Sequence, residues 1–209
     1  MQTSTTEPRP PLDRLLPLAD LVRALTCVSG RAVACGDAAL ATELLRTDGD
    51  CARCGSALHE AWLDLLRSAN ASRSDQASAV ALLVSLDNIA DLATSICERV
   101  AGVANRETAL DVPALRRLAE LVPEQLNDAL GAVRANDGPS AQRVLDRSVS
   151  VDACFAQVHL ELLQLAGEGS QGMDAAQQLH ALGRALERIG DDASEIAATV
   201  RRSPSHLEP

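Results

Sequence analysis

The chain has 209 residues, a formal net charge of −10 and 46% hydrophobic residues. Its single Phe, single Trp and lack of Tyr favour helices packed through aliphatic side chains and disfavour a β-rich fold. Both halves of the chain are acidic, which argues against a nucleic-acid-binding protein because phosphate contacts need clustered cations. No apolar run approaches the roughly 20 residues of a membrane span, so we expect no direct membrane insertion. The N-terminus lacks the apolar region of a signal peptide, so we expect a cytoplasmic protein with free thiols.

The first half of the chain predicts a tail and three helices. Residues 1–11 are polar and contain three prolines, which is typical of a disordered tail. The pair Gly36-Asp37 is expected to end one helix and cap the next. Gly49 and Gly55 each cost a helix about 1 kcal/mol relative to Ala, so we expect the second helix to be weak there. The three expected helices are Leu12–Cys35, Ala38–Ser68 and Asp75–Val103.

The second half predicts the same succession of elements. Residues 104–110 form a linker, and Pro113 stands in the first turn of the fourth helix, where its missing N–H is tolerated. Breakers at 136–139 and 167–172 separate the helices that follow, and residues 203–209 form a tail. The three expected helices are 113–135, 140–166 and 175–202.

An internal repeat with an offset of 100 residues relates the two halves. Apolar residues spaced by steps of four and three, as in the seam of a packed helix, recur without a gap. They are Leu82, Leu86, Ile89, Ala93, Ile96 and Val100, and Leu182, Leu186, Ile189, Ala193, Ile196 and Val200. Short loops make consecutive helices antiparallel neighbours. The sequence therefore predicts an all-α fold that is a tandem repeat of two antiparallel three-helix bundles, residues 12–103 and 111–202.

Two pairs of acidic residues flank this seam, and we call each pair, with its spacing of four residues, an acidic step. Asp87 and Asp91 lie four residues apart in the first repeat, and Glu187 and Asp191 do so in the second. Like charges with this spacing repel each other by a few tenths of a kcal/mol, so their recurrence suggests a compensating cation. A solvated helix flank explains the charges equally well.

Antiparallel pairing of the second and third helices of each repeat adds a third carboxylate. Residue numbers that sum to about 139 should lie opposite each other in the first repeat, and about 339 in the second. This pairs Asp48 with Asp91 and Asp152 with Glu187, whereas Asp87 and Asp191 face the non-ligands Ala52 and Ser148. The predicted carboxylate sets are Asp48, Asp87 and Asp91, and Asp152, Glu187 and Asp191.

The same rule places His159 opposite His180, and we interpret this pair as half-buried residues flanking the seam. Cys51 and Cys54 form a C-x-x-C sequence inside a helical pattern, without the second pair that a zinc ribbon needs. The alternative interpretation is that five of the cysteines are small apolar side chains that fill space in the core. These are Cys27, Cys35, Cys54, Cys97 and Cys154.

The stretch Leu186-Glu187-Arg188-Ile189-Gly190-Asp191, followed by Ala193 and Ile196-Ala197, closely resembles the signature of the PhoU family. The resemblance extends from about Leu12 to Arg202 in repeat length and helix order. The first repeat is similar but divergent, because it keeps Asp87 and Asp91 and loses the Arg and Gly between them. The resemblance implies a tandem repeat of two three-helix bundles.

The resemblance also implies a function. Family members are non-enzymatic regulators of phosphate uptake that restrain a phosphate ABC transporter, through its ATPase, and its phosphate-sensing histidine kinase. Their acidic steps bind metal ions, which carries over to Asp48, Asp87, Asp91, Asp152, Glu187 and Asp191. Because Ala52 and Ser148 depart from the family pattern, we expect single Mg²⁺, Mn²⁺, Zn²⁺ or iron ions instead of a cluster. A homodimer is also among the expected arrangements.

Two other functions are weighed against this one. A carboxylate-bridged metalloenzyme of the ferritin type binds its metal ions through Glu-x-x-His motifs, and the sequence has none. A metal-free helical scaffold with a different regulatory target needs only the solvated acids. Metal analysis of the purified protein separates the scaffold from the metal-binding regulator.

Overall fold

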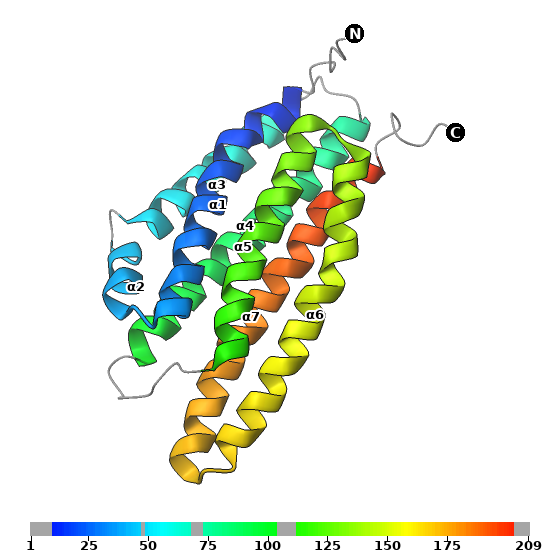
Figure 1. Ribbon diagram of the computed structural model, residues 1–209. Coiled ribbons are helices and arrows are strands. Elements are labelled where there is room, and N and C mark those ends of the chain that lie inside the picture. The colour runs from blue at the N-terminus through cyan, green and yellow to red at the C-terminus, as the bar shows by residue number, and fades with distance from the viewer. Residues whose placement is uncertain (1–9, 47–48, 68–72, 104–111, 203–209) are drawn as a thin grey trace.

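The computed structural model describes residues 10–46, 49–67, 73–103 and 112–202, and within these ranges the regular structure is entirely α-helical (Figure 1). The all-α class predicted from composition is therefore confirmed. The predicted linker 104–110, the tail 203–209 and residues 1–9 of the predicted tail 1–11 lie outside the described residues. The tail prediction is wrong at Pro10 and Pro11, which form the start of the first helix. The helices are α1 Pro10–Cys35, α2 Ala38–Leu44, α3 Asp50–Arg67, α4 Arg73–Val103, α5 Pro113–Ala135, α6 Gly138–Ala166 and α7 Ser170–Arg201.

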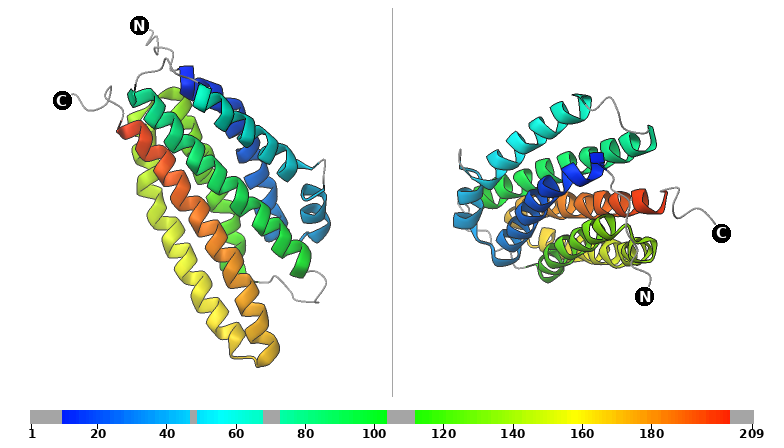
Figure 2. Two further views of the ribbon diagram at one scale, coloured as in Figure 1. Left: turned by 180° about the vertical axis from the view of Figure 1, so that it is seen from behind. Right: turned by 90° about the horizontal axis from the view of Figure 1, so that it is seen from above.

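The two halves of the chain pack against each other through their inner helices. α1 lies against both α4 and α5, and α4 lies antiparallel to α7 (Figures 1 and 2). The helices α3 and α6 contact helices of their own half and lie on the outside (Figure 2). The inner four helices therefore form the centre of the molecule, and α3 and α6 each present an outer face.

The second predicted helix is divided into α2 and α3, so the described residues contain one helix more than the six expected. The N–H of Gly49 donates to the carbonyl oxygen of Arg46 at 2.8 Å, which turns the chain between the two helices. A Cβ atom at Gly49 would lie 2.5 Å from the carbonyl oxygen of Leu44. This close approach excludes a side chain, and it explains why the weakness expected at Gly49 is a complete break.

The turns that follow α1 and α5 are built alike. Gly36 and Asn136 end these helices in the left-handed conformation, with φ of 62° and 50°. The next residue caps the following helix in each case. A carboxylate oxygen of Asp37 accepts the N–H of Leu40 at 2.9 Å, and one of Asp137 accepts the N–H of Ser140 at 3.1 Å. The cap predicted at Gly36-Asp37 is confirmed.

Burial follows the repeat residue by residue. The sequence of buried, half-buried and exposed side chains over 81–90 is identical to that over 181–190. All twelve seam residues predicted from the spacing are at most 3% exposed. Each large aliphatic side chain buried in this way stabilises the fold by about 2 kcal/mol. The predicted seam is therefore confirmed in α4 and α7.

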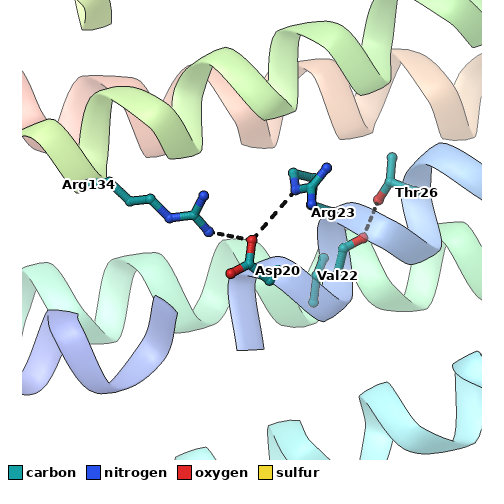
Figure 3. Close-up of polar contacts among 5 residues, drawn as sticks. All are labelled: Asp20, Val22, Arg23, Thr26 and Arg134. Carbon is teal, nitrogen blue, oxygen red and sulfur yellow. Dashed lines mark hydrogen bonds and ion pairs between the residues drawn. The ribbon is translucent and has the colours of Figure 1, made fainter. Parts of the chain in front are cut away.

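Polar contacts and one close backbone approach also join the two halves. The carboxylate of Asp20 on α1 binds the guanidinium of Arg134 on α5 and also lies 3.6 Å from Arg23 (Figure 3). A Cβ atom at Gly30 would lie 2.6 Å from the carbonyl oxygen of Ala119, so α1 and α5 approach closely there because Gly30 has no side chain. The interface between the halves is thus specific as well as apolar.

Helix α4 is more apolar than we expect from the length of its apolar runs. The segment Asp75–Gly102 is long and apolar enough to cross a membrane by length and composition alone. Half of its most apolar window is buried inside the protein, where Leu82, Leu83 and Leu86 have no exposed surface. A core helix of a bundle has the same composition, so the apolarity of α4 is explained by its central position.

Candidate functional site

The acidic step of the second repeat lies on α7, close to an acid of α6. Glu187 is half-buried, and Asp191 and Asp152 are exposed. Burial and then the charge of Asp191 raise the pKa of Glu187, and Asp152 adds to this rise. Burial and then the charge of Asp152 raise the pKa of Asp191. The three predicted carboxylates of this repeat therefore interact through space.

An arginine partly compensates this negative charge. Nη1 of Arg184 lies 3.1 Å from a carboxylate oxygen of Glu187, one turn along α7. The same guanidinium lowers the pKa of both Glu187 and Asp191, although burial outweighs its effect. It also lies 5.9 Å from the centre of the Phe155 ring on α6. Arg184 was not among the residues singled out from the sequence, although its position three residues before Glu187 places it on the same face.

The histidines of the second repeat face each other as the pairing rule predicts. Nε2 of His159 on α6 lies 3.0 Å from Nε2 of His180 on α7. Burial, then the neighbouring charges of His159 and Arg184, lower the pKa of His180. The ring of Phe155 packs edge-on against His159 at 4.4 Å between centroids. The α6–α7 side of the bundle thus combines a histidine pair, an aromatic ring and the acidic cluster formed by Asp152, Glu187 and Asp191.

The acidic step of the first repeat has a different environment. Asp87 is half-buried and Asp91 is exposed on α4, while Asp48 lies outside the described residues. The indole Nε1–H of Trp62 on α3 donates to a carboxylate oxygen of Asp87 at 3.2 Å. The prediction that Ala52 faces Asp87 is therefore wrong. The residue numbers of this contact sum to 149, not 139, so α3 is displaced along α4 by about ten residues.

The described part of the chain contains no group of three or more His, Cys, Asp or Glu side chains arranged to hold a metal ion. Asp152, Glu187 and Asp191 influence one another electrostatically without converging on one point. In the conformation of the structure these residues do not fit a preformed metal centre. The metal ions expected from the resemblance remain a prediction.

The cysteines divide into two groups. All six are free, and Cys54, Cys97 and Cys154 are buried as expected, but Cys27 and Cys35 are exposed, so the filler interpretation is wrong for these two. A hydrogen bond with the Cys97 thiol is the main cause that lowers the pKa of Cys51 to about 7. Burial raises the pKa of Cys54 to about 11. Cys51 therefore interacts with Cys97 on α4, outside the C-x-x-C sequence.

The family model of the PhoU domain matches residues 115–200, from the first turn of α5 to the end of α7. The phosphate-specific transport system accessory protein PhoU homolog of Zymomonas mobilis is 32% identical over 115 residues, which cover 55% of this chain and 48% of that protein. The homolog of Rhizobium meliloti with the same description is 26% identical over 131 residues, which cover 62% of this chain and 55% of that protein. The chain spans about half the length of the curated relatives it matches.

Two solved structures share the fold over most of the chain. PhoU from Pseudomonas aeruginosa superposes with a TM-score of 0.77 at 23% identity, covering 90% of this chain and 92% of that chain. PhoU from Streptococcus pneumoniae superposes with a TM-score of 0.78 at 19% identity, covering 94% and 95%. The domain match, the curated relatives and the shared fold agree. Residues 115–200 thus match the PhoU domain, and the chain shares its fold with the two PhoU structures.

The residues that match the PhoU domain include the acidic cluster of the second repeat. The structure also explains why position 190, next to Asp191, is a glycine. A Cβ atom at Gly190 would lie 3.2 Å from the side-chain oxygen of Gln125 on α5. Gln125 is only 3% exposed, and its Nε2 donates to the hydroxyl of Ser194 at 2.9 Å. Gly190 therefore makes room for a buried amide. The first repeat has Leu25 and Ala90 at the equivalent positions, and this exchange could have indicated the polar contact.

Proposed function

We propose that the chain is a cytoplasmic, non-enzymatic accessory protein of a phosphate transport system. It would restrain the ATPase of a phosphate ABC transporter, the associated phosphate-sensing histidine kinase, or both. The proposal is supported by the PhoU domain match over residues 115–200 and by relatives described as accessory proteins of phosphate-specific transport systems. The observation that carries it is the signature acidic step, Glu187 and Asp191, on an accessible side of α7 beside Asp152.

An adaptor of this kind acts by presenting a surface. Asp91, Asp152 and Asp191 are exposed, so both repeats offer negative charge to a binding partner. Such charges steer a basic partner surface towards the protein and discriminate against acidic ones. The buried seam beneath these acids fixes their positions on the helices, so a binding partner meets the same arrangement of charges each time.

Deletion of the gene from its host tests the function. We expect phosphate uptake and the expression of phosphate-starvation genes to rise when phosphate is plentiful, and to return to normal with the wild-type gene. The double variant Glu187→Gln plus Asp191→Asn keeps side-chain shape and removes charge, so we expect it to restore regulation poorly. Asp174→Asn, an exposed acid earlier on α7, is the matched control. Unchanged uptake and gene expression after deletion would contradict the proposal.

A second candidate is a helical interaction scaffold that works without metal. It is favoured by one observation, namely that no three metal-binding side chains converge within the described residues. Metal content per chain, measured by mass spectrometry on protein purified without chelator or metal-charged resin, distinguishes the two. Stoichiometric metal that is lost in the Asp91→Ala plus Asp191→Ala variant supports the sequence-based metal site. Metal content that does not respond to these changes supports the scaffold.

A further inference from the structure

Two thiols from different helices of the first repeat lie against each other. Cys51 is the second residue of α3 and is half-buried, whereas Cys97 lies on α4 and has no exposed surface. A hydrogen bond joins their side chains, and both cysteines are free. They lie 46 residues apart in the chain. A covalent bond between them would therefore link two separate helices.

A second contact between the same two helices shows that this pairing follows from how they pack. The indole of Trp62 on α3 donates to Asp87 on α4 at 3.2 Å. Trp62 lies eleven residues after Cys51, and Asp87 lies ten residues before Cys97. The two contacts are thus separated by about 16 Å along α3 and about 15 Å along α4, in opposite chain directions. A single antiparallel register of α3 on α4 produces both contacts.

The surroundings of Cys51 make it the thiol that reacts first. The hydrogen bond with Cys97 is the main cause that lowers its pKa to about 7, and a hydrogen bond with Thr94 adds to this effect. Burial and the charge of Asp50 act in the opposite direction without cancelling these contacts. Cys51 also stands in the first turn of α3, where unpaired backbone N–H groups favour a thiolate. The thiolate is the form of cysteine that attacks an oxidant.

Cys97 has the properties of the thiol that reacts second. The hydrogen bond with Cys51 and then burial raise its pKa, so it stays protonated at neutral pH. Because it has no exposed surface, an oxidant in solution does not reach it directly. Its side chain nevertheless contacts Cys51. A partly accessible thiolate beside a protected second thiol is the arrangement of a redox-sensing pair.

Cys54 is the other candidate for a bond with Cys51, because it completes the C-x-x-C sequence. It lies one turn further along α3 and is only 2% exposed. Burial raises its pKa to about 11. The hydrogen bond of Cys51 reaches across to α4, so the geometry favours Cys97 over Cys54.

The second repeat shows that the bundle does not need thiols at these positions. The residues one hundred positions after Cys51 and Cys97 are Val151 and Ala197. They are 5% and 0% exposed, so aliphatic side chains serve as core residues there. The thiol pair is therefore a property of the first repeat and not a requirement of the fold.

We propose that Cys51 and Cys97 form a reversible redox pair, in which a peroxide oxidises Cys51 and a disulfide then closes between α3 and α4. This modification site does not depend on the proposed role in phosphate transport. The disulfide would fasten the first turn of α3, next to the break at Gly49, to the inner helix α4. A dithiol reductant returns both residues to free thiols.

The reaction has two steps. The Cys51 thiolate attacks one oxygen of hydrogen peroxide, the O–O bond breaks, and Cys51 becomes a sulfenic acid while hydroxide leaves. The sulfur of Cys97 then attacks the sulfenic sulfur of Cys51. The S–O bond breaks, and the hydroxyl group leaves as water with the proton of the Cys97 thiol. Two thiols and one hydrogen peroxide thus give one disulfide and two water molecules, as two electrons pass from sulfur to the peroxide.

Peptide mapping identifies the cysteines that become linked. The exposed thiols are first removed with Cys27→Ser and Cys35→Ser, and this full-length parent protein is treated with hydrogen peroxide, blocked with N-ethylmaleimide and digested with trypsin. Trypsin cleaves after Arg53, so Cys51, Cys54 and Cys97 fall on the separate peptides 47–53, 54–67 and 74–99.

Mass spectrometry without reduction should find peptide 47–53 joined to peptide 74–99, and dithiothreitol should release both. Peptide 47–53 joined mainly to 54–67, or the absence of any linked peptide, would overturn the proposal. Mixing unlabelled chains with chains labelled with nitrogen-15 locates the bond. Linked peptides that carry a single label show a bond within one chain, whereas linked peptides of mixed label would overturn it.

Single variants of the parent protein test the two roles. Cys97→Ala, which introduces the residue found at position 197, should abolish the linked peptides and leave Cys51 as a sulfenic acid that dimedone labels on peptide 47–53. Cys54→Ala is the matched control and should form the 47–53 and 74–99 link as the parent does. Circular dichroism checks that both variants are folded. Loss of this link in Cys54→Ala, or no dimedone label in Cys97→Ala, would overturn the assigned roles.

Urea denaturation tests whether the disulfide fastens the two helices. A bond that closes a long loop restricts the unfolded chain, so the oxidised parent should unfold at a higher urea concentration than the reduced parent. Cys97→Ala given the same peroxide treatment should show no such increase. An oxidised parent with the linked peptides and an unchanged or lower midpoint would contradict the fastening of α3 to α4.

Discussion

The two repeats share their inner helices and differ in their outer ones. The seam residues of α4 and α7 occupy equivalent positions and are buried to the same extent. The outer segment of the second repeat is one helix of 29 residues, whereas the first repeat has helices of 7 and 18 residues. An inner helix is constrained on several sides, while an outer helix packs mainly within its own repeat. The outer helices are therefore where the two repeats could diverge.

The acidic steps differ in the same way. Asp87 accepts a hydrogen bond from Trp62, while Glu187 lies among Asp152, Asp191 and Arg184. In the first repeat a neutral N–H group stabilises the carboxylate, whereas in the second repeat the repulsion between acids is opposed by Arg184 and Arg188. Identical positions on the inner helix thus acquire different electrostatic environments from the outer helix that faces them.

The largest expected effect tests the similarity of the inner helices. Leu86→Ala and Leu186→Ala each remove a side chain with no exposed surface and should each lower the free energy of unfolding by about 3 kcal/mol. Urea denaturation followed by circular dichroism measures both. The matched controls are Leu66→Ala and Leu163→Ala on the outer helices, which should change stability by less than about 0.5 kcal/mol. A large difference between the two seam variants would show that the repeats are not equivalent in their cores.

The second prediction concerns the break between α2 and α3. Gly49→Ala should destabilise the protein by about 1–3 kcal/mol, because the added Cβ atom meets the carbonyl oxygen of Leu44, although Ala favours helices. Val149→Gly at the equivalent position of α6 should cost about 1 kcal/mol through helix propensity alone. Gly55→Ala is the control, because a Cβ atom there meets nothing within 4 Å and should be stabilising. A stabilising Gly49→Ala variant would contradict the close approach.

The third prediction exploits the different partners of the two acidic steps. Trp62→Phe keeps the aromatic packing and removes the N–H that Asp87 accepts, so it should cost about 1 kcal/mol. Glu187→Gln should instead raise the free energy of unfolding by a few tenths of a kcal/mol at neutral pH, because it removes a charge that is disfavoured by burial and then by repulsion from Asp191. Equal and negative effects of both substitutions would contradict the difference between the two sites.

The pH dependence of this effect has a definite sign. Burial and then the charge of Asp191 raise the pKa of Glu187 above its ordinary value of 4.5. The folded protein therefore holds this proton more tightly than the unfolded chain does, and Glu187 lowers stability as pH rises from 4.5 through the folded pKa. The advantage of Glu187→Gln should disappear when unfolding is measured well below pH 4.5. An advantage that persists in acid would have another cause.

The fourth prediction concerns the chemical reactivity of a thiol in the first repeat and not the stability of the protein. The hydrogen bond with Cys97 lowers the pKa of Cys51 to about 7, so a large fraction of Cys51 is thiolate at neutral pH. Alkylation by iodoacetamide, followed by peptide mass spectrometry, should proceed with a midpoint near pH 7 at Cys51. Cys54, with a pKa of about 11, should react far more slowly. Position 151 of the second repeat is Val and offers no counterpart.

The sequence predicts the inner helices well because their spacing recurs without a gap at an offset of 100 residues. It also predicts the facing of His159 and His180, since a short turn between two unbroken helices determines their register. The contact of Trp62 with Asp87 could not be predicted in the same way. The break at Gly49 separates α3 from α2, and the register of α3 on α4 is then set by tertiary packing instead of by the length of a loop.

The packing of α1 on α5 and of α4 on α7 has a consequence for how the protein is made. The ribosome releases α1 and α4 before α5 and α7 exist, so the inner faces of the first repeat emerge without their partners. Until the chain is complete, this apolar surface is open to aggregation or to a chaperone. The helices of the second repeat are not exposed in this way, because each of them can pack against a helix that has already been synthesised. Its synthesis should therefore be the step that converts a vulnerable nascent chain into a protected one.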